Sequence, residues 1–324
     1  MQQHPEIIEI VSQFGHDIID HAIAKAKKIA VEPASINIEK HAIDDHDVKH
    51  LEQFLQEKNW QGPLIVSKPR TGSTIMGISL LFAKSFQGDY QFPRYIHEPV
   101  APIFWQGATI DTTFDILSQL HVHDIIQESA YQFTHEKLAH LFLKHARKPI
   151  VFLTRHPRIA WVSRWRIILN RLLEKMAVSS LHNQITHALK YHDFSTIGHV
   201  LARDVKPNNN GWYAFLYLQQ LCEQHNFEYV IIDNTIFRQK PTAIFKQLFQ
   251  AWQLPFDLSV ATWQNLKEVR SRIVMGNMAS HEEYHDYYAK TIDSQRGIHQ
   301  MDEELLAWEK LPKNLRGFSQ DINI

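Results

Sequence analysis

The pattern of hydrophobic and polar positions predicts strands that alternate with helices. Mainly apolar runs rich in β-branched residues, bounded by turn residues, occur at 63–67, 149–154 and 227–232 and predict buried strands. A shorter run, Tyr95 to Glu98, ends at a proline and predicts a fourth strand. Elsewhere apolar residues recur every three or four positions, which predicts helices at about 5–28, 45–59, 74–86, 135–147, 158–175, 179–192, 211–225 and 242–252.

This alternation predicts an α/β fold, with a central parallel sheet flanked by helices on both faces. We expect one large domain over 61–324, with a helical extension, 1–60, packed on it. The run Asn-Asn-Asn-Gly at 208–211 is expected to form a loop. Ligands of parallel sheets bind at the carboxyl ends of the strands. The loops 68–73 and 155–157 both follow predicted strands, so both are candidate binding loops.

Composition and charge narrow the classes of partner. The formal net charge of −1 provides no basic excess for binding nucleic acid or an anionic membrane. Cys222 is the only cysteine, which excludes an intramolecular disulfide and disfavours a cysteine zinc site. No apolar run approaches the roughly 18 residues of a membrane-spanning helix, and acidic residues interrupt the apolar stretches of 1–20, unlike a signal peptide. We therefore expect a cytoplasmic protein.

The loop after the first long strand has the chemistry of an anion site. Its glycine permits a tight turn, its backbone amides precede a helix, and its side chains add hydroxyl groups and two positive charges. A serine- and threonine-rich helix cap with a chance arginine is the alternative interpretation. A Walker A loop fits poorly, because that motif needs lysine directly after its second glycine. The candidate cofactor-binding residues of the loop are Lys68, Arg70, Thr71, Gly72, Ser73 and Thr74.

A second candidate group follows the strand at 149–154. Arg155 ends that strand, and Ser163 lies two helical turns further along. The two side chains bind one phosphate group only if the turn between them brings them together. Taken alone, the segment fits an ordinary junction between a strand and a helix, with a surface arginine, better than a phosphate site.

Together these segments resemble the sulfotransferases that use 3′-phosphoadenosine-5′-phosphosulfate (PAPS). Pro69 to Thr74 is similar to the family's loop for the 5′-phosphosulfate, and Arg155 and Ser163 have the family's spacing of eight positions for the 3′-phosphate. The strand 229–233, the helix after Pro241 and the Leu-Pro-Phe at 254–256 follow in the family's order. The resemblance covers roughly 63–257.

The chain departs from the family pattern at three points. Arg70 stands where the cytosolic branch has lysine, and Ile75 where it has an aromatic residue, so the loop is closer to the carbohydrate- and tyrosine-modifying branches. The family's late adenosine motif is absent. Its candidate replacements are Arg270, Arg272 and the segment 295–297.

The resemblance implies a P-loop-like sulfotransferase architecture and a metal-free enzyme with PAPS as sulfuryl donor. The acceptor would be a hydroxyl, or an amine, of a small molecule or carbohydrate. Arg70 and the loop amides would stabilise the leaving phosphate. Glu98 is the expected catalytic base and His97 the second choice. The alternatives are a P-loop kinase of small molecules and a nucleotide-binding relative without catalysis, and the oligomeric state stays open.

Three further patterns are weaker. His-Glu-Glu-Tyr-His at 281–285 matches a zinc-protease signature, but its surroundings are polar and the chain has 21 histidines. For His121 and His123, a solvated loop or strand is a better explanation than a metal site. Trp161 and Trp165 lie one helical turn apart and favour core packing over an acceptor pocket.

Overall fold

The computed structural model describes residues 43–86, 93–133, 135–156, 180–191, 193–262 and 272–275, with parts of 17–25 and 159–169. The chain divides into two compact units. The sheet unit comprises 36–154 and 213–301, and the second unit comprises 1–35, 155–212 and 302–324.

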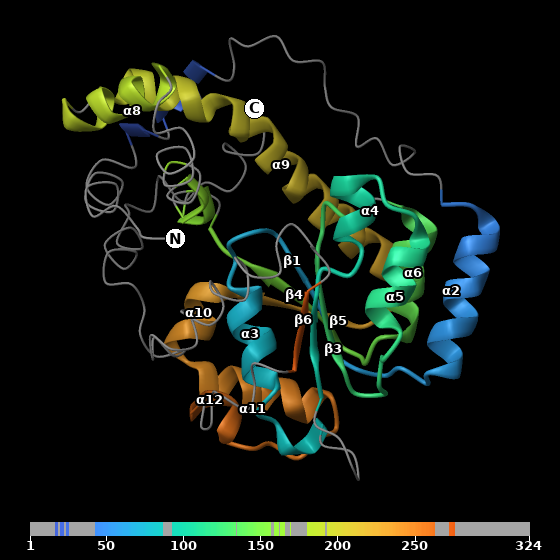
Figure 1. Ribbon diagram of the computed structural model, residues 1–324. Coiled ribbons are helices and arrows are strands. Elements are labelled where there is room, and N and C mark those ends of the chain that lie inside the picture. The colour runs from blue at the N-terminus through green and yellow to red at the C-terminus, as the bar shows by residue number, and fades with distance from the viewer. Residues whose placement is uncertain are drawn as a thin grey trace. The chain divides into compact units, whose positions relative to one another are not determined.

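The sheet unit is built on six parallel strands in the order β5-β4-β1-β3-β2-β6 (Figure 1). This arrangement confirms the expected α/β class with a central parallel sheet. The four strands predicted from the apolar runs are present, and two more were not predicted. The expected burial of 227–232 is wrong, because β5 is an edge strand in which only Ile232 is buried. The strands are β1 (Leu64–Ser67), β2 (Tyr95–His97), β3 (Ile125–Ser129), β4 (Ile150–Thr154), β5 (Tyr229–Asp233) and β6 (Ile273–Met275).

Strand β3 escaped prediction because only its first two residues are apolar. Gln127, Glu128 and Ser129 complete the strand and are buried with them. A charged residue in such a position breaks the continuous apolar run that marks a buried strand. Strand β6 has only three residues, too few to show a period. The central position of β3 between β1 and β2 was therefore visible only in the folded chain.

Successive strand residues face opposite sides of the sheet, and each side has its own hydrophobic core. Val66 and Ile126 contribute to one core, and Ile65 and Ile125 to the other. Figure 1 shows helices on both sides. The first core is covered by α2 (Asp45–Glu57), α4 (Ala101–Gln106), α5 (Ile110–Leu117), α6 (Glu136–His145) and the end of α9 (Phe194–Gln224). The second is covered by α3 (Ser73–Leu80), the 3₁₀ helix Lys84–Phe86, α10 (Asn234–Gln239), α11 (Pro241–Ala251) and α12 (Ser259–Thr262).

The expected loop at 208–211 is wrong, because helix α9 continues through it. Asparagine and glycine lower helix stability by about 0.5–1 kcal/mol each relative to alanine. Beyond them, Phe215, Leu218 and Cys222 are buried against the sheet. Such packing overrides a local preference of this size. In the second unit, α8 (Ser180–Lys190) confirms the helix expected at 179–192, and the described residues of 17–25 and 159–169 are helical.

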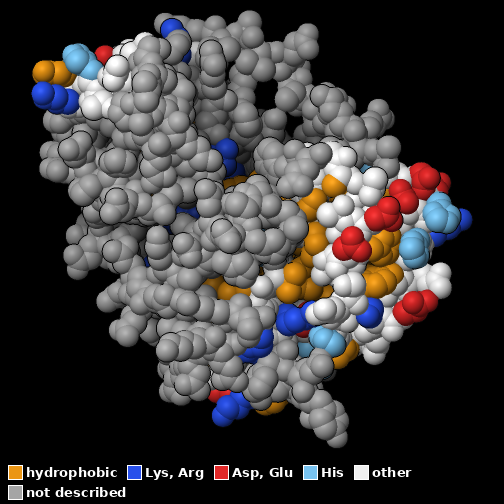
Figure 2. All heavy atoms as spheres, viewed as in Figure 1, with side chains coloured by type: hydrophobic (Ala, Val, Ile, Leu, Met, Phe, Trp, Pro, Cys, Tyr) orange, Lys and Arg blue, Asp and Glu red, His pale blue; other side chains and the backbone are white. Residues whose placement is uncertain are grey.

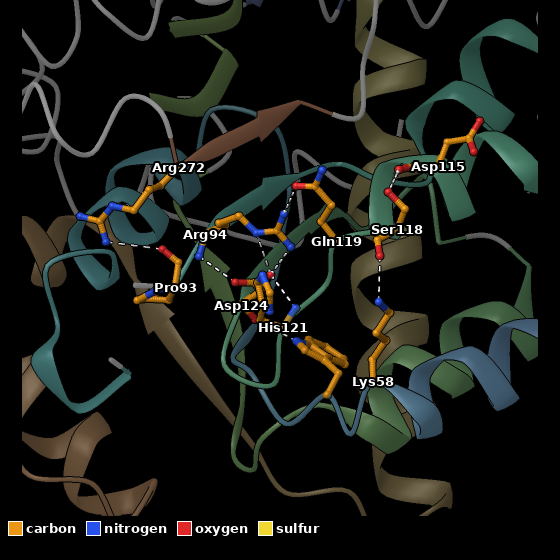
Figure 3. Close-up of polar contacts among 10 residues, drawn as sticks. Lys58, Pro93, Arg94, Asp115, Ser118, Gln119, His121, Asp124 and Arg272 are labelled. Atoms are coloured by element: carbon orange, nitrogen blue, oxygen red, sulfur yellow. Dashed lines mark hydrogen bonds and ion pairs between the residues drawn. The ribbon is translucent and has the colours of Figure 1, made fainter. Parts of the chain in front are cut away.

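A buried ion pair holds the amino-terminal edge of the sheet (Figure 3). Asp124, fully buried before β3, accepts hydrogen bonds from Nε and Nη2 of Arg94 at 3.1 and 2.7 Å, and from its backbone N–H at 2.8 Å. Arg94 directly precedes β2, so the contact sets the start of two neighbouring strands. The backbone carbonyl of Asp124 also accepts from the indole of Trp60 at 2.8 Å.

Candidate functional site

The order of the strands identifies one edge of the sheet as the natural binding region. From β1 the chain builds β2 and β3 on one side, and then β4 and β5 on the other. The topological switch point therefore lies between β1 and β4, where parallel sheets bind ligands at the carboxyl ends of their strands. Ser67, the last residue of β1, pairs with Leu153 near the end of β4. The loop 68–72 leaves β1 at this point.

Two residues of this loop have left-handed backbone conformations. Arg70 has φ 69° and Gly72 has φ 88°. A non-glycine residue in this region costs about 1–2 kcal/mol and persists where the surrounding structure enforces it, often at functional sites. The Thr71 hydroxyl donates to the carbonyl of Lys68 at 2.7 Å and closes the turn. The loop has a defined shape, and its carboxyl end starts α3 with Gly72 as N-cap.

The loop also carries two positively charged side chains, one buried and one half-buried. The side chain of Lys68 is 1% exposed, and Thr71 and Ser73 are buried as well. Arg70 and Thr74 are half-buried, so solvent reaches them. Positive groups and hydroxyls at a helix start are suited to an anion with several oxygens. The six predicted binding residues lie in the turn after β1 and in the first residues of α3.

Asn234 forms the floor of the turn and was missed in the sequence. It begins α10 directly after β5, and its carboxamide is 1% exposed. A Cβ on Gly72 would lie 2.3 Å from Asn234 Oδ1, so only glycine fits the space above it. Oδ1 has no hydrogen-bond partner. No local pattern announces this contact, because the two residues are 162 positions apart in the chain.

Glu98 lies at the same edge of the sheet, directly after β2. Its backbone is left-handed, with φ 52°, and its N–H donates to the Gln127 carbonyl at 2.7 Å. Its carboxylate accepts from the Ser129 hydroxyl at 2.5 Å and from Gln132 Nε2 at 3.3 Å. The predicted base is therefore held by three residues in and after β3. None of those three residues was predicted to belong to a site.

Glu128 is a second carboxyl group beside Glu98. It is 0% exposed and accepts backbone hydrogen bonds from Val100 and Ser129, both at 3.0 Å. Burial, reinforced by the neighbouring Glu98, raises the pKa of Glu128 well above its ordinary value. Ser129 thus contacts both carboxyls, through its N–H to one and its hydroxyl to the other. This pair was invisible in the sequence because β3 was not predicted.

His97, the second candidate base, is buried within the end of β2. Its ring packs edge-on to Tyr95, with centroids 5.8 Å apart. Burial lowers the pKa of His97, and the nearby Glu98 opposes this shift. The Tyr95 hydroxyl donates to Gln127 Oε1, whose Nε2 donates to Ser67, both at 3.2 Å. This buried polar ladder connects the strands that carry the loop and Glu98.

Arg155 and Ser163 belong to the second unit. Arg155 follows the last residue of β4 and is buried, and Ser163 is a half-buried helical residue. Convergence of these two residues with the loop 68–74 on one nucleotide remains a prediction from the sequence. Trp161 and Trp165 are both buried and stack at 5.9 Å, which confirms core packing.

Of the candidate replacements for the adenosine motif, the structure describes only Arg272. Arg272 precedes β6 at the amino-terminal edge of the sheet, where its Nη1 donates to the carbonyls of Leu81 and Pro93 at 3.0 and 3.5 Å (Figure 3). Strands of a parallel sheet all start at one edge, so Arg272 lies opposite the loop 68–74, and its suggested adenosine role is wrong. Arg270 and the segments 281–285 and 295–297 lie outside the described residues.

Two histidine-containing patterns have structural explanations. The segment 121–124 is a turn in which the His121 N–H donates to Asp124 Oδ2 at 2.9 Å. In the part of the chain that is described, one carboxylate and histidine group has metal-like spacing: Asp44, His46 and Asp47. Asp44 and Asp47 there form the capping box of α2. Figure 2 shows acidic and histidine side chains gathered over that helix, at the right of the view, as on a solvated face.

The chain matches no protein-family profile, no curated protein and no solved structure. None of the helices within the described ranges is long and apolar enough to cross a membrane. The site itself therefore carries the functional argument.

Proposed function

We propose that this protein transfers a sulfuryl group from PAPS to a hydroxyl, or less readily an amine, of a small-molecule or carbohydrate acceptor. The carrying observation is the loop 68–74, with left-handed Arg70 and Gly72, at the topological switch point of a parallel sheet. Glycine is required at position 72, because a Cβ there would lie 2.3 Å from Asn234 Oδ1. The sulfotransferase-like order of motifs supports the identity of the anion.

The loop would bind the 5′-phosphosulfate, which supplies the activated sulfuryl group. Arg70 and the amides at the start of α3 offset the charge that develops on the leaving phosphate oxygen. A preorganised donor of this kind contributes about 2.7–4 kcal/mol to transition-state stabilisation. Lys68 adds positive charge beneath the loop, and Arg155 and Ser163 would hold the 3′-phosphate.

Glu98 would accept the proton of the acceptor group. The acceptor oxygen forms a bond to sulfur in line with the breaking bond to the leaving phosphate, and the proton passes to a Glu98 oxygen. Ser129 and Gln132 orient that carboxylate. Glu98 is preferred over His97, because it is half-buried whereas the His97 side chain is buried within the strand.

Ligand-dependent stability tests the nucleotide. We expect 3′-phosphoadenosine-5′-phosphate to raise the melting temperature without magnesium, by an amount that grows with the logarithm of its concentration. Stabilisation by ATP only, and only with magnesium, would favour the kinase interpretation. Normal binding of the bisphosphate with no transfer to any acceptor would favour a non-catalytic protein.

Replacement of Arg70 tests the catalytic role. We expect Arg70→Ala to fold normally and to lose transfer by about 10²-fold or more, as for removal of one oxyanion donor. Lys84→Ala is a matched control, because that cation is exposed and lies after α3. Full turnover by Arg70→Ala in a donor-dependent assay would rule out the proposed role.

A further inference from the structure

We propose that Glu128 is the protonated partner of Glu98, so that the two carboxyl groups together hold one proton and Glu98 carries the negative charge. Glu128 then acts as a positioning residue for the base. This inference rests on the proposed function only for the role that it gives Glu98 in transfer.

Burial decides which carboxyl group carries the charge. Glu128 is 0% exposed, whereas Glu98 is half-buried and reaches solvent. A charge costs far more free energy to bury than to leave in contact with water. Two neighbouring carboxyls cannot both ionise cheaply, so the proton stays on the more buried one. The raised pKa of Glu128 agrees with this assignment.

Hydrogen bonds connect the pair into one unit. Ser129 donates its N–H to Glu128 Oε1 and its hydroxyl to Glu98 Oε1, and Gln132 donates to the other Glu98 oxygen. The two backbone N–H bonds to Glu128 favour its ionised form, but complete burial and the neighbouring Glu98 outweigh them and raise its pKa.

Helix α5 keeps Asp111 and Asp115 exposed. It turns Thr113 inward, where the hydroxyl donates to the Pro99 carbonyl at 3.2 Å. The titratable groups that the described neighbouring strands place here are Lys68 after β1, His97 at the end of β2 and Glu98 after it.

For the reaction, this arrangement provides a base, Glu98, that carries a negative charge beside a neutral Glu128. With Glu128 neutral, Glu98 can accept the acceptor's proton without a second negative charge beside it. Loss of the Glu128 proton at higher pH would place a second negative charge beside Glu98. The transfer rate would then depend on pH on the alkaline side through Glu128.

Stability as a function of pH tests the proton without any substrate. Unfolded Glu128 loses its proton near its ordinary pKa of about 4.5, whereas the folded protein retains it, so the wild type loses stability as pH rises between the two values. Glu128→Gln lacks this loss. We expect the ratio of unfolding constants, wild type over variant, to rise by up to about tenfold per pH unit in this window. Glu57→Gln, at the exposed end of α2, should show no such trend.

A ratio that is constant, or that falls with rising pH, would overturn the proposal. If Glu128→Gln does not fold, the proton can still be detected in the wild-type protein by infrared spectroscopy. Infrared spectra of protein isotope-labelled at glutamate should contain the carbonyl band of a protonated glutamic acid near neutral pH, and its absence would overturn the proposal equally.

Turnover separates the two carboxyls. We expect Glu98→Gln to lose about 10²-fold or more. Glu128→Gln, which substitutes a neutral group of similar shape, should reduce turnover less and remove the alkaline pH dependence. Equal losses, or an unchanged pH profile, would contradict the positioning role. Failure of nucleotide binding would instead count against the proposed function and leave the stability test standing.

Discussion

At the scale of single residues, the site depends on backbone conformations that side chains rarely adopt. Arg70, Gly72 and Glu98 all have positive φ, and all three lie at the carboxyl edge of the sheet. The Gln127 carbonyl accepts from the Glu98 N–H, and the Asn234 side chain leaves no space for a Cβ at Gly72. Local strain of this kind is maintained by tertiary structure.

A comparison of Gly72 and Gly107 separates the cost of a left-handed backbone from the cost of a collision with Asn234. Both have positive φ, but a Cβ on Gly107 would meet nothing within 4 Å. We expect Gly107→Ala to cost about 1–2 kcal/mol for the left-handed backbone alone. Gly72→Ala should cost more, because its Cβ collides with Asn234, and should abolish stabilisation by the bisphosphate.

Urea unfolding measures both costs, and melting temperatures with and without nucleotide measure binding. Equal destabilisation by the two substitutions, with binding intact, would show that the Asn234 contact does not shape the loop.

At the scale of elements, the two edges of the sheet have different roles. The carboxyl edge carries the strained, half-buried candidate site. The amino edge is an anchor, in which Arg94 and Asp124 join the starts of β2 and β3 through three hydrogen bonds. Since Glu98 directly follows β2, and Glu128 and Ser129 end β3, the anchor sets the register on which the carboxyl cluster depends.

The anchor predicts a large loss of stability on truncation. Asp124→Ala leaves the Arg94 guanidinium without its buried carboxylate, and breaking such a pair costs about 3–5 kcal/mol. Asp45→Ala is the control, because Asp45 and its partner Lys137 form an exposed pair that contributes little to stability. Chemical denaturation compares the two. Similar small losses would show that the strand starts are set by apolar packing alone.

At the scale of the sheet unit, several histidines are kept neutral by the fold. Burial lowers the pKa of five of them: His97, His123, His135, His140 and His145. In the unfolded chain they bind protons near the ordinary value of about 6.5, while the folded chain binds fewer. Stability is therefore present above that pH and lost as pH falls through it.

This dependence is measurable as a urea midpoint that decreases on acidification below pH of about 6.5. The measurement is made on the Glu128→Gln variant, because Glu128 itself lowers stability as pH rises, which is opposite to the effect of the histidines. A further substitution, His140→Gln, should reduce the slope, since His140 stacks edge-on against His225 at 4.3 Å and the like charges repel. A pH-independent midpoint would contradict this account.

The sequence by itself determined the α/β class, four of the six strands and the candidate loop 68–74. These features are local: an apolar run bounded by turn residues indicates a strand, and a glycine among hydroxyl and basic residues indicates a turn that suits an anion. Glu98 was also identifiable, as an acidic residue directly after a short strand.

Only the tertiary structure decided what surrounds those residues. Strand β3 contains Gln127 and Glu128, so its sequence does not look buried, yet β1 and β2 enclose it by hydrogen bonding. The Asn234 floor under Gly72 and the carboxyl pair of Glu98 and Glu128 join segments far apart in the chain. Such contacts follow from strand order and register, which no local pattern encodes, because pairing between distant segments is settled by the packing of the whole sheet.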